Sequence, residues 1–241
     1  MSIAVLCPGQ GKSAELSQID IVEASLASYP ELVAGTGPNG LAFVGLSLGE
    51  WTAMCLAGVL TKTDVLRLVV RRQELMDEAC GESPGKMAAI IGLDNIEVES
   101  ICEEIGGVWP ANYLPGQLVI SGLIVAVDEA VAIARDKGAR ARELQTRGAY
   151  HTPLMEPANT LLVPLLNKVA FSPPTSAIYS TVSGERVCDP LVAKQLLMRQ
   201  MVAPVRLEAA MRAMILDGVT EPVELEPSGV LAKLFHRVII P

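Results

Sequence analysis

The chain has 241 residues, half of them hydrophobic, and carries a formal net charge of −8. This length and composition indicate a globular protein with one large domain, or with one domain and an inserted second unit. The negative charge argues against a general nucleic-acid binder, because no excess of Lys and Arg is present to neutralise phosphates. No run of about 18 uninterrupted apolar residues occurs, so we expect no membrane-spanning segment.

The cysteines and histidines do not have the spacing of a metal site. No CxxC pair occurs, and the chain has only two histidines, so we expect no bound metal. The N-terminal residues lack the basic segment of a signal peptide, and we expect a cytoplasmic protein with reduced thiols. The five cysteines are Cys7, Cys55, Cys80, Cys102 and Cys188.

The first third of the chain reads as alternating strands and helices. Residues 3–6 are a continuous apolar run, which is typical of a strand covered on both faces. This order of elements favours a parallel sheet. The elements predicted after that strand are a helix over residues 15–34, a loop over 35–40, a strand over 41–44, a helix from residue 50 and a helix over 62–80.

From residue 85 the order of elements changes to β-α-β-β-α-β, which is the order of a ferredoxin-like unit. We therefore predict that residues 85–146 form a small subdomain inserted into a larger one built from residues 1–84 and 147–241. The predicted strands of this unit are 87–91, 107–111, 117–121 and 139–144, and the predicted helices are 96–105 and 125–136.

After the insert, the chain returns to the larger subdomain. A segment that starts at residue 148 leads into a helix that runs to residue 168. The later predicted elements are a strand over 177–181, helices over 190–201 and 205–216, a strand over 223–225 and a helical turn over 230–235.

The stretch Gly45-Leu46-Ser47-Leu48-Gly49 has the G-x-S-x-G pattern between an apolar run and a helix-compatible run. A strand, a sharp turn and a helix form a nucleophile elbow, in which the hydroxyl of Ser47 is exposed at the helix N-terminus. There the main-chain N–H of Leu48 and the helix dipole can stabilise an oxyanion. The alternative is a plain strand–turn–helix junction in which Ser47 is a helix N-cap.

A serine nucleophile needs a base, and only His151 and His236 are available. His151 lies in a turn before a helix that starts with proline. At such a position the imidazole can point into a site and stay partly accessible. His236 lies near the C-terminus, where an exposed or capping role is the alternative. We therefore predict His151 as the base. No acidic third member is evident, but a backbone carbonyl can also orient an imidazole.

Six motifs in fixed order link this chain to a known family. It resembles the malonyl-CoA:acyl-carrier-protein transacylases nearly end to end, and also the acyltransferase domains of polyketide synthases and the related subunit of malonate decarboxylase. The resemblance implies an α/β fold, with an α/β-hydrolase-like large subdomain that contains a parallel sheet and an inserted ferredoxin-like small subdomain. The motifs are PGQG at 8–11, GLSLGE at 45–50, RQELM at 72–76, GKMAA at 85–89, PGQLVISG at 115–122 and YHTPLM at 150–155.

The resemblance implies the catalytic roles. Ser47 would attack the thioester of malonyl-CoA, and His151 would accept the Ser proton and then protonate the leaving thiolate. The main-chain N–H groups of Gln10 and Leu48 would form the oxyanion hole. Arg72 would bind the free carboxylate of the malonyl group, because a planar guanidinium pairs with a carboxylate through two hydrogen bonds.

The resemblance also implies further site residues. A main-chain carbonyl near Arg206 would orient His151, and Gln18 and Asn112 would lie near the acyl pocket. Tyr150 stands directly before the base, where an aromatic ring accompanies malonyl and a small Ser accompanies methylmalonyl in the polyketide acyltransferases. We therefore predict a preference for malonyl.

The implied activity moves malonyl from malonyl-CoA to the phosphopantetheine thiol of an acyl carrier protein, through a malonyl-Ser47 intermediate, in fatty-acid or polyketide synthesis. The substrates and partners are malonyl-CoA and the carrier protein, with no bound cofactor, no nucleic acid and no membrane. The alternatives are the malonate decarboxylase transacylase, a non-catalytic carrier-protein-binding domain and a general esterase. Two departures bear on them: Leu46 stands where most members have His, and six residues separate Gly11 from Gln18 where the family has several dozen.

Overall fold

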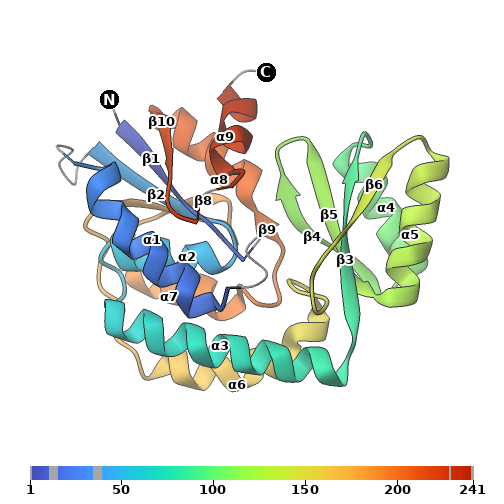
Figure 1. Ribbon diagram of the computed structural model, residues 1–241, viewed down its shortest axis with the longest axis horizontal. Coiled ribbons are helices and arrows are strands. Elements are labelled where there is room, and N and C mark those ends of the chain that lie inside the picture. Colours follow the sequence, from blue (N-terminus) through green and yellow to red (C-terminus); the bar gives the residue numbers. More distant parts are fainter. Residues whose placement is uncertain (1, 11–15, 35–39, 228, 240–241) are drawn as a thin grey trace.

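Two sheets stand in two neighbouring lobes, and helices cover them from outside (Figure 1). The structure is a computed structural model, and it describes residues 2–10, 16–34, 40–227 and 229–239. The prediction of an α/β fold is confirmed. Most of the segment between Gly11 and Gln18 lies outside the described residues.

The sheet of the large lobe has five strands, and its four-strand core is parallel. Strand β1 (Ser2–Cys7) lies inside the sheet with a neighbouring strand on each side, and its residues from Ala4 to Cys7 are buried, as the apolar run predicts. The fifth strand is antiparallel and was not predicted, because it is only three residues long and begins with two exposed charged residues. The order is β10 (Val219–Glu224), β1 (Ser2–Cys7), β2 (Leu41–Gly45), β7 (Ala177–Ser180) and β8 (Glu185–Val187).

Alternate residues of these strands pack on opposite faces of the sheet. Val5 and Phe43 contact one layer of helices, whereas Leu6 and Val44 contact the other. The first layer is α1 (Gln18–Leu32), α2 (Leu48–Leu56), α3 (Lys62–Glu82), α6 (Glu156–Asn167) and α7 (Pro190–Arg199), and the second is α8 (Leu207–Leu216) and α9 (Leu231–Ile239).

The small lobe has the strand order of a ferredoxin-like fold, with four antiparallel strands and two helices on its outer face (Figure 1). Its order is β6 (Arg140–Leu144), β3 (Gly85–Ile91), β5 (Gln117–Leu123), β4 (Val108–Leu114) and β9 (Val205–Arg206), and its helices are α4 (Asn95–Ile105) and α5 (Ile124–Asp136).

Strand β9 corrects one prediction. Residues 205–216 were expected to form a single helix, but Val205 and Arg206 pair in parallel with β4 before α8 begins. The partner strand is nearly a hundred residues away, so local spacing carried no sign of this pairing. The long segment before α6 also begins differently, with a short 3-10 helix at Pro153–Met155.

The two lobes share a hydrophobic core. Met87 and Val119 on the inner face of the small sheet belong to the same buried cluster as Met211 of α8 and Leu234 of α9. One further buried cluster belongs to the large lobe alone and one to the small lobe alone, and the subdomain limits at residues 84/85 and 146/147 stay a prediction. Within the described residues, no helix is long and apolar enough to cross a membrane.

Candidate active site

Ser47 occupies a tight elbow between β2 and α2. Its backbone has φ 53° and ψ −107°, a left-handed conformation that is costly for a residue with a side chain. The flanking glycines permit the turn: a Cβ on Gly45 would lie 2.0 Å from the carbonyl carbon of Gly49, and a Cβ on Gly49 would lie 2.0 Å from the oxygen of Cys7. Ser47 is the N-cap residue of α2 by position, but its side chain makes no capping hydrogen bond to the helix.

His151 lies against the Ser47 hydroxyl, with 2.8 Å between Nε2 and Oγ. Its other ring nitrogen, Nδ1, lies 3.0 Å from the main-chain oxygen of Gln200. A carbonyl only accepts, so Nδ1 carries the proton of the neutral ring, and Nε2 is left to accept the Ser47 hydroxyl proton. His236 is exposed on α9 and has no such contact.

The environment keeps His151 neutral. Burial lowers its pKa to about 4, and the positive charge of Arg72 adds to this effect. A neutral imidazole at physiological pH is in the form that accepts a proton. His151 itself has a left-handed φ of 61°, and its turn is closed by the Thr152 hydroxyl, which donates to the oxygen of Ala149 at 2.7 Å.

The carbonyl that orients His151 is that of Gln200, six residues before the predicted Arg206, and the main chain of Ala203, close to the predicted position, also acts on the ring. The backbone N–H of Arg206 donates to Thr181 O at 2.6 Å, and its guanidinium stacks over the Tyr113 ring at 5.2 Å, so Arg206 belongs to the junction with β4. The sequence analysis missed Gln200 because it orients His151 through a main-chain oxygen, which any residue type possesses.

Arg72 is buried beside the nucleophile. Its Nη2 lies 3.3 Å from Ser47 Oγ, and its Nη1 donates to Gln18 Oε1 at 2.7 Å. Its Nε has no hydrogen-bond partner, and no carboxylate of the described residues forms an ion pair with it. Burial lowers its pKa to about 10, so it stays charged at neutral pH. The neighbouring Arg71 is partly exposed and pairs with Glu74 at 2.8 Å.

Gln18 contacts Arg72 and two other residues of α3. Its backbone N–H donates to Gln73 Oε1 at 2.8 Å, and its Nε2 lies 3.7 Å from the sulfur of Met76. With its oxygen already bonded to Arg72, Gln18 is placed to orient the guanidinium.

The loop that carries Gln10 packs against the elbow. Leu46 N–H donates to Cys7 O at 3.1 Å, and a Cβ on Gly9 would lie 2.5 Å from the oxygen of Leu46. Gln10 follows this contact directly, and Leu48 is the first residue of α2. The next two N–H groups, those of Gly49 and Glu50, donate to the oxygens of Leu46 at 2.9 Å and Ser47 at 3.0 Å.

Neither Asn112 nor Tyr150 makes a hydrogen bond to Ser47, His151 or Arg72. Asn112 lies on β4, and its Oδ1 is buried with no partner among the described residues. Tyr150 is half-buried and packs against the cores on both faces of the large sheet. Burial raises the pKa of Tyr150, and the charge of Arg72 acts in the opposite direction.

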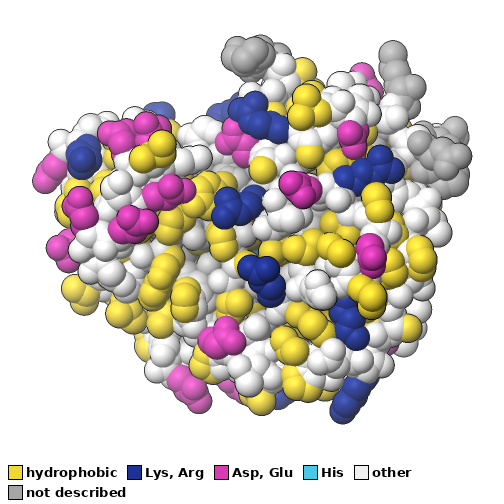
Figure 2. Space-filling view, turned by 180° about the vertical axis from the view of Figure 1, so that it is seen from behind, with side chains coloured by type: hydrophobic (Ala, Val, Ile, Leu, Met, Phe, Trp, Pro, Cys, Tyr) yellow, Lys and Arg dark blue, Asp and Glu magenta, His cyan; other side chains and the backbone are white. Residues whose placement is uncertain are grey.

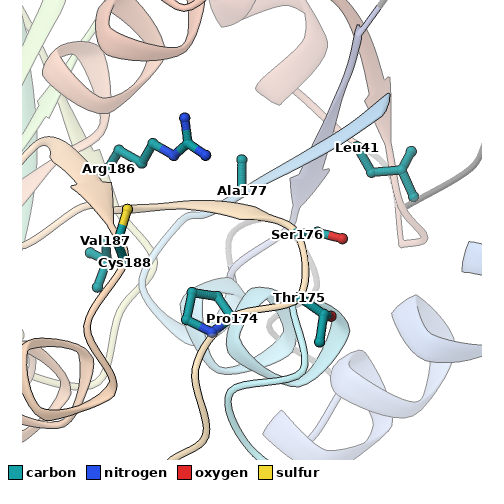
Figure 3. A pocket seen from close by; sticks show the side chains of 8 residues that line it. All are labelled: Leu41, Pro174, Thr175, Ser176, Ala177, Arg186, Val187 and Cys188. Carbon is teal, nitrogen blue, oxygen red and sulfur yellow. The ribbon is translucent and has the colours of Figure 1, made fainter. Parts of the chain in front are cut away.

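A separate cavity of about 250 Å³ lies at the opposite edge of the large sheet (Figure 3). Leu41 and Ala177 in its wall begin β2 and β7, whereas Ser47 follows the end of β2. None of the predicted site residues lines it. Across the described residues, no group of three or more His, Cys, Asp or Glu side chains is placed to hold a metal.

Comparison with known proteins places the chain among acyl-transferring enzymes. A family profile described as "Acyl transferase domain" matches residues 8–238. The malonyl CoA-acyl carrier protein transacylase of Escherichia coli K12 is 35% identical over 240 residues, which cover 95% of this chain and 78% of that protein.

Solved structures of the same kind have the same fold. The structure titled MCAT from Mycobacterium tuberculosis superposes with a TM-score of 0.89 at 28% identity, covering 100% of this chain and 94% of that one. A structure titled as a type II PKS acyl-carrier protein in complex with its malonyl-transacylase gives a TM-score of 0.90 at 28% identity, covering 99% and 93%.

Proposed function

Because the chain belongs to the acyl transferase domain family, we propose that it transfers a malonyl group from malonyl-CoA to the phosphopantetheine thiol of an acyl carrier protein. The observation that carries the proposal is Arg72, a buried cation that forms no ion pair with a carboxylate of the described residues and lies 3.3 Å from the nucleophilic oxygen. A buried unpaired charge is costly, and a substrate carboxylate would offset that cost.

The position of Arg72 limits the length of the acyl group. Its guanidinium is within hydrogen-bonding distance of Ser47 Oγ, so the carboxylate and the reacting carbonyl must be close together in the substrate. In malonyl a single methylene separates them. A longer diacid would carry its carboxylate past the guanidinium, and a neutral acyl group would leave Arg72 unpaired.

The reaction proceeds in two halves. His151 Nε2 accepts the Ser47 proton while Oγ bonds to the thioester carbon, and the carbonyl oxygen becomes an oxyanion. The main-chain N–H groups of Gln10 and Leu48 stabilise this oxyanion. The C–S bond then breaks, and the proton on His151 passes to the CoA thiolate. The carrier-protein thiol reverses these steps and regenerates Ser47.

Other predicted residues have supporting roles in this proposal. Gln18 orients Arg72, and Tyr150 crowds an α-methyl group, which favours malonyl over methylmalonyl. Asn112 supplies a buried acceptor near the junction of the lobes. No bound cofactor enters any of these steps.

The charge distribution bears on the carrier protein. On the face in Figure 2, Asp and Glu side chains gather over the small lobe, whereas Lys and Arg side chains lie mainly over the middle of the face and the large lobe. An acidic carrier protein would meet less electrostatic repulsion over the middle of this face and the large lobe than over the small lobe. A cytoplasmic location is also a proposal, and its support is that all five cysteines are free thiols.

Intact-mass measurement tests the proposal. After mixing with malonyl-CoA, the protein should gain the mass of one malonyl group, and adding a phosphopantetheinylated acyl carrier protein should remove it. The Ser47→Ala variant should gain nothing. An absent adduct, or one that persists in Ser47→Ala, contradicts the proposal. If malonyl passes from Ser47 only to the carrier protein of a malonate decarboxylase, the chain belongs to that branch of the family. Leu46, before the nucleophile, is also typical of that branch.

A further inference from the structure

Glu50 is a completely buried carboxylate that the reaction does not use. It is 0% exposed and lies in the first turn of α2, three residues after the nucleophile. The positive end of the helix dipole favours an anion there. A carboxylate away from water still needs several hydrogen-bond donors, so its partners indicate its role.

All the partners of Glu50 donate hydrogen bonds to it. The hydroxyl of Ser180 lies 2.5 Å from Oε1, the hydroxyl of Thr181 lies 2.8 Å from Oε2, and Nε2 of Gln200 lies 3.1 Å from Oε2. Two of these donors come from the end of β7, and the third comes from the residue that orients His151.

The carboxamide of Gln200 has one orientation that satisfies its surroundings. Its Oε1 accepts from the indole N–H of Trp51 at 3.1 Å, and an indole can only donate. Its Nε2 therefore faces two acceptors, Glu50 Oε2 and the main-chain oxygen of Ser47, the latter at 2.7 Å. A rotated carboxamide would break all three bonds.

Gln200 thus touches both reacting residues. Its side chain holds the carbonyl of Ser47, and its main-chain oxygen holds the ring of His151. Both residues have left-handed backbones, which persist only where the surroundings fix them. A bond to the carbonyl of a strained residue is a direct way to fix it.

We propose that Glu50 is a positioning residue, whose carboxylate fixes the carboxamide of Gln200 and thereby holds Ser47 and His151 in reactive geometry. The inference rests on the proposed function only in so far as Ser47 is the acyl-accepting group. Glu50 touches neither substrate nor the reacting atoms, and it acts through hydrogen-bond acceptance.

The test measures how fast Ser47 is acylated by malonyl-CoA, and separately how fast it reacts with phenylmethanesulfonyl fluoride, which has no carboxylate. In Glu50→Leu, which cannot accept hydrogen bonds, we expect both rates to fall about 100-fold, because small misplacements of reacting groups have effects of this size. Glu50 forms no ion pair with Arg72 and has the smallest of the electrostatic effects on its pKa, so the KM for malonyl-CoA should change by less than about threefold.

Glu50→Gln provides the conservative rescue. Its carboxamide oxygen can still accept from Gln200 while its NH₂ turns toward the oxygen of Ser180, so we expect rates within about tenfold of wild type. The matched control is Glu224→Leu. It removes a half-buried carboxylate that accepts hydrogen bonds from three backbone N–H groups at the start of α9. It should lower thermal stability and leave both rates unchanged.

A double-mutant cycle with Gln200→Met identifies the route. This variant removes the carboxamide but keeps the main-chain oxygen that faces His151. If Glu50 acts through Gln200, the double variant should be no slower than the slower single variant. If Glu50→Leu does not fold, Gln200→Met alone should still show the loss of about 100-fold.

Three results would overturn the proposal: a folded Glu50→Leu within about threefold of wild type, losses that multiply in the cycle, or a Gln200→Met variant that reacts like wild type. Failure of the proposed function can be told apart from failure of the positioning role of Glu50. In that case the wild type takes no malonyl but still reacts at Ser47 with the sulfonyl fluoride. The double-mutant cycle can then be measured on the sulfonylation rates alone.

Discussion

The guanidinium of Arg72 lies 3.3 Å from the hydroxyl of Ser47, so the group that would bind the substrate carboxylate and the group that would attack the thioester are immediate neighbours. Arg72 comes from the buried face of α3, together with Leu68, Leu75 and Met76 at helical spacing. The helix therefore fixes the guanidinium by its own packing. Substrate selection and chemistry share one small volume in this arrangement.

Replacing Arg72 should change which acyl group is used. In Arg72→Ala we expect kcat/KM for malonyl-CoA to fall about 100-fold, because a charge-assisted pair in a buried site is lost. For acetyl-CoA, which has no carboxylate, it should stay level or rise. Steady-state assays with both thioesters measure this. Arg71→Ala, at a partly exposed position, is the control, and equal losses for both substrates would exclude carboxylate recognition.

The pH dependence of Ser47 reactivity should reflect the lowered pKa of His151. The neutral imidazole is the active base, and its pKa of about 4 lies below the ordinary value. Reaction with phenylmethanesulfonyl fluoride should therefore stay level as the pH falls from about 8 to about 5 and decline only near pH 4. In Arg72→Ala the decline should move to higher pH, because a positive charge beside His151 is removed. A wild-type decline near pH 6.5, with the fold intact by circular dichroism, would contradict this.

The elbow should tolerate no side chain at Gly49. In Gly49→Ala the new Cβ would lie 2.0 Å from the oxygen of Cys7, which is backbone and cannot move aside cheaply. We expect a loss of at least about 3 kcal/mol in the free energy of unfolding, measured by urea denaturation. Gly81→Ala is the matched control. Gly81 is exposed near the C-terminal end of α3, and no atom lies within 4 Å of a Cβ added there, so this substitution should stabilise the protein by about 0.5–1 kcal/mol.

The sequence was sufficient for features that depend on side-chain type and local pattern. Ser47 stands out by its glycines, Arg72 by its motif, and the small lobe by its alternation of strands and helices. The structure brings Ser47, His151 and Arg72 together as the motifs indicate. The Ser47–His151 contact spans 104 positions, and the choice of His151 rested on there being only two histidines and on the resemblance to a family, not on any local pattern that joins the two.

What the sequence could not supply are non-local backbone relationships. Gln200 contributes a main-chain oxygen, which no side-chain pattern marks, and the resemblance to the family pointed to Arg206, six residues later. The pairing of Val205 with Asn112 depends on how the lobes meet. Glu50 reads as an ordinary helix residue, and its burial follows from Ser180 and Thr181, which come from a strand more than a hundred positions later.

The acyl preference should depend on the ring of Tyr150. It precedes His151, is half-buried, and packs against the cores on both faces of the large sheet. In Tyr150→Ser the removed ring leaves room for an α-methyl group, so we expect kcat/KM for methylmalonyl-CoA relative to malonyl-CoA to rise about tenfold. Tyr150→Phe keeps the ring and should keep the wild-type ratio. Competition assays with both thioesters decide this, with melting temperatures to verify that each variant is folded. An unchanged ratio in folded Tyr150→Ser would mean that another wall of the pocket excludes the methyl group.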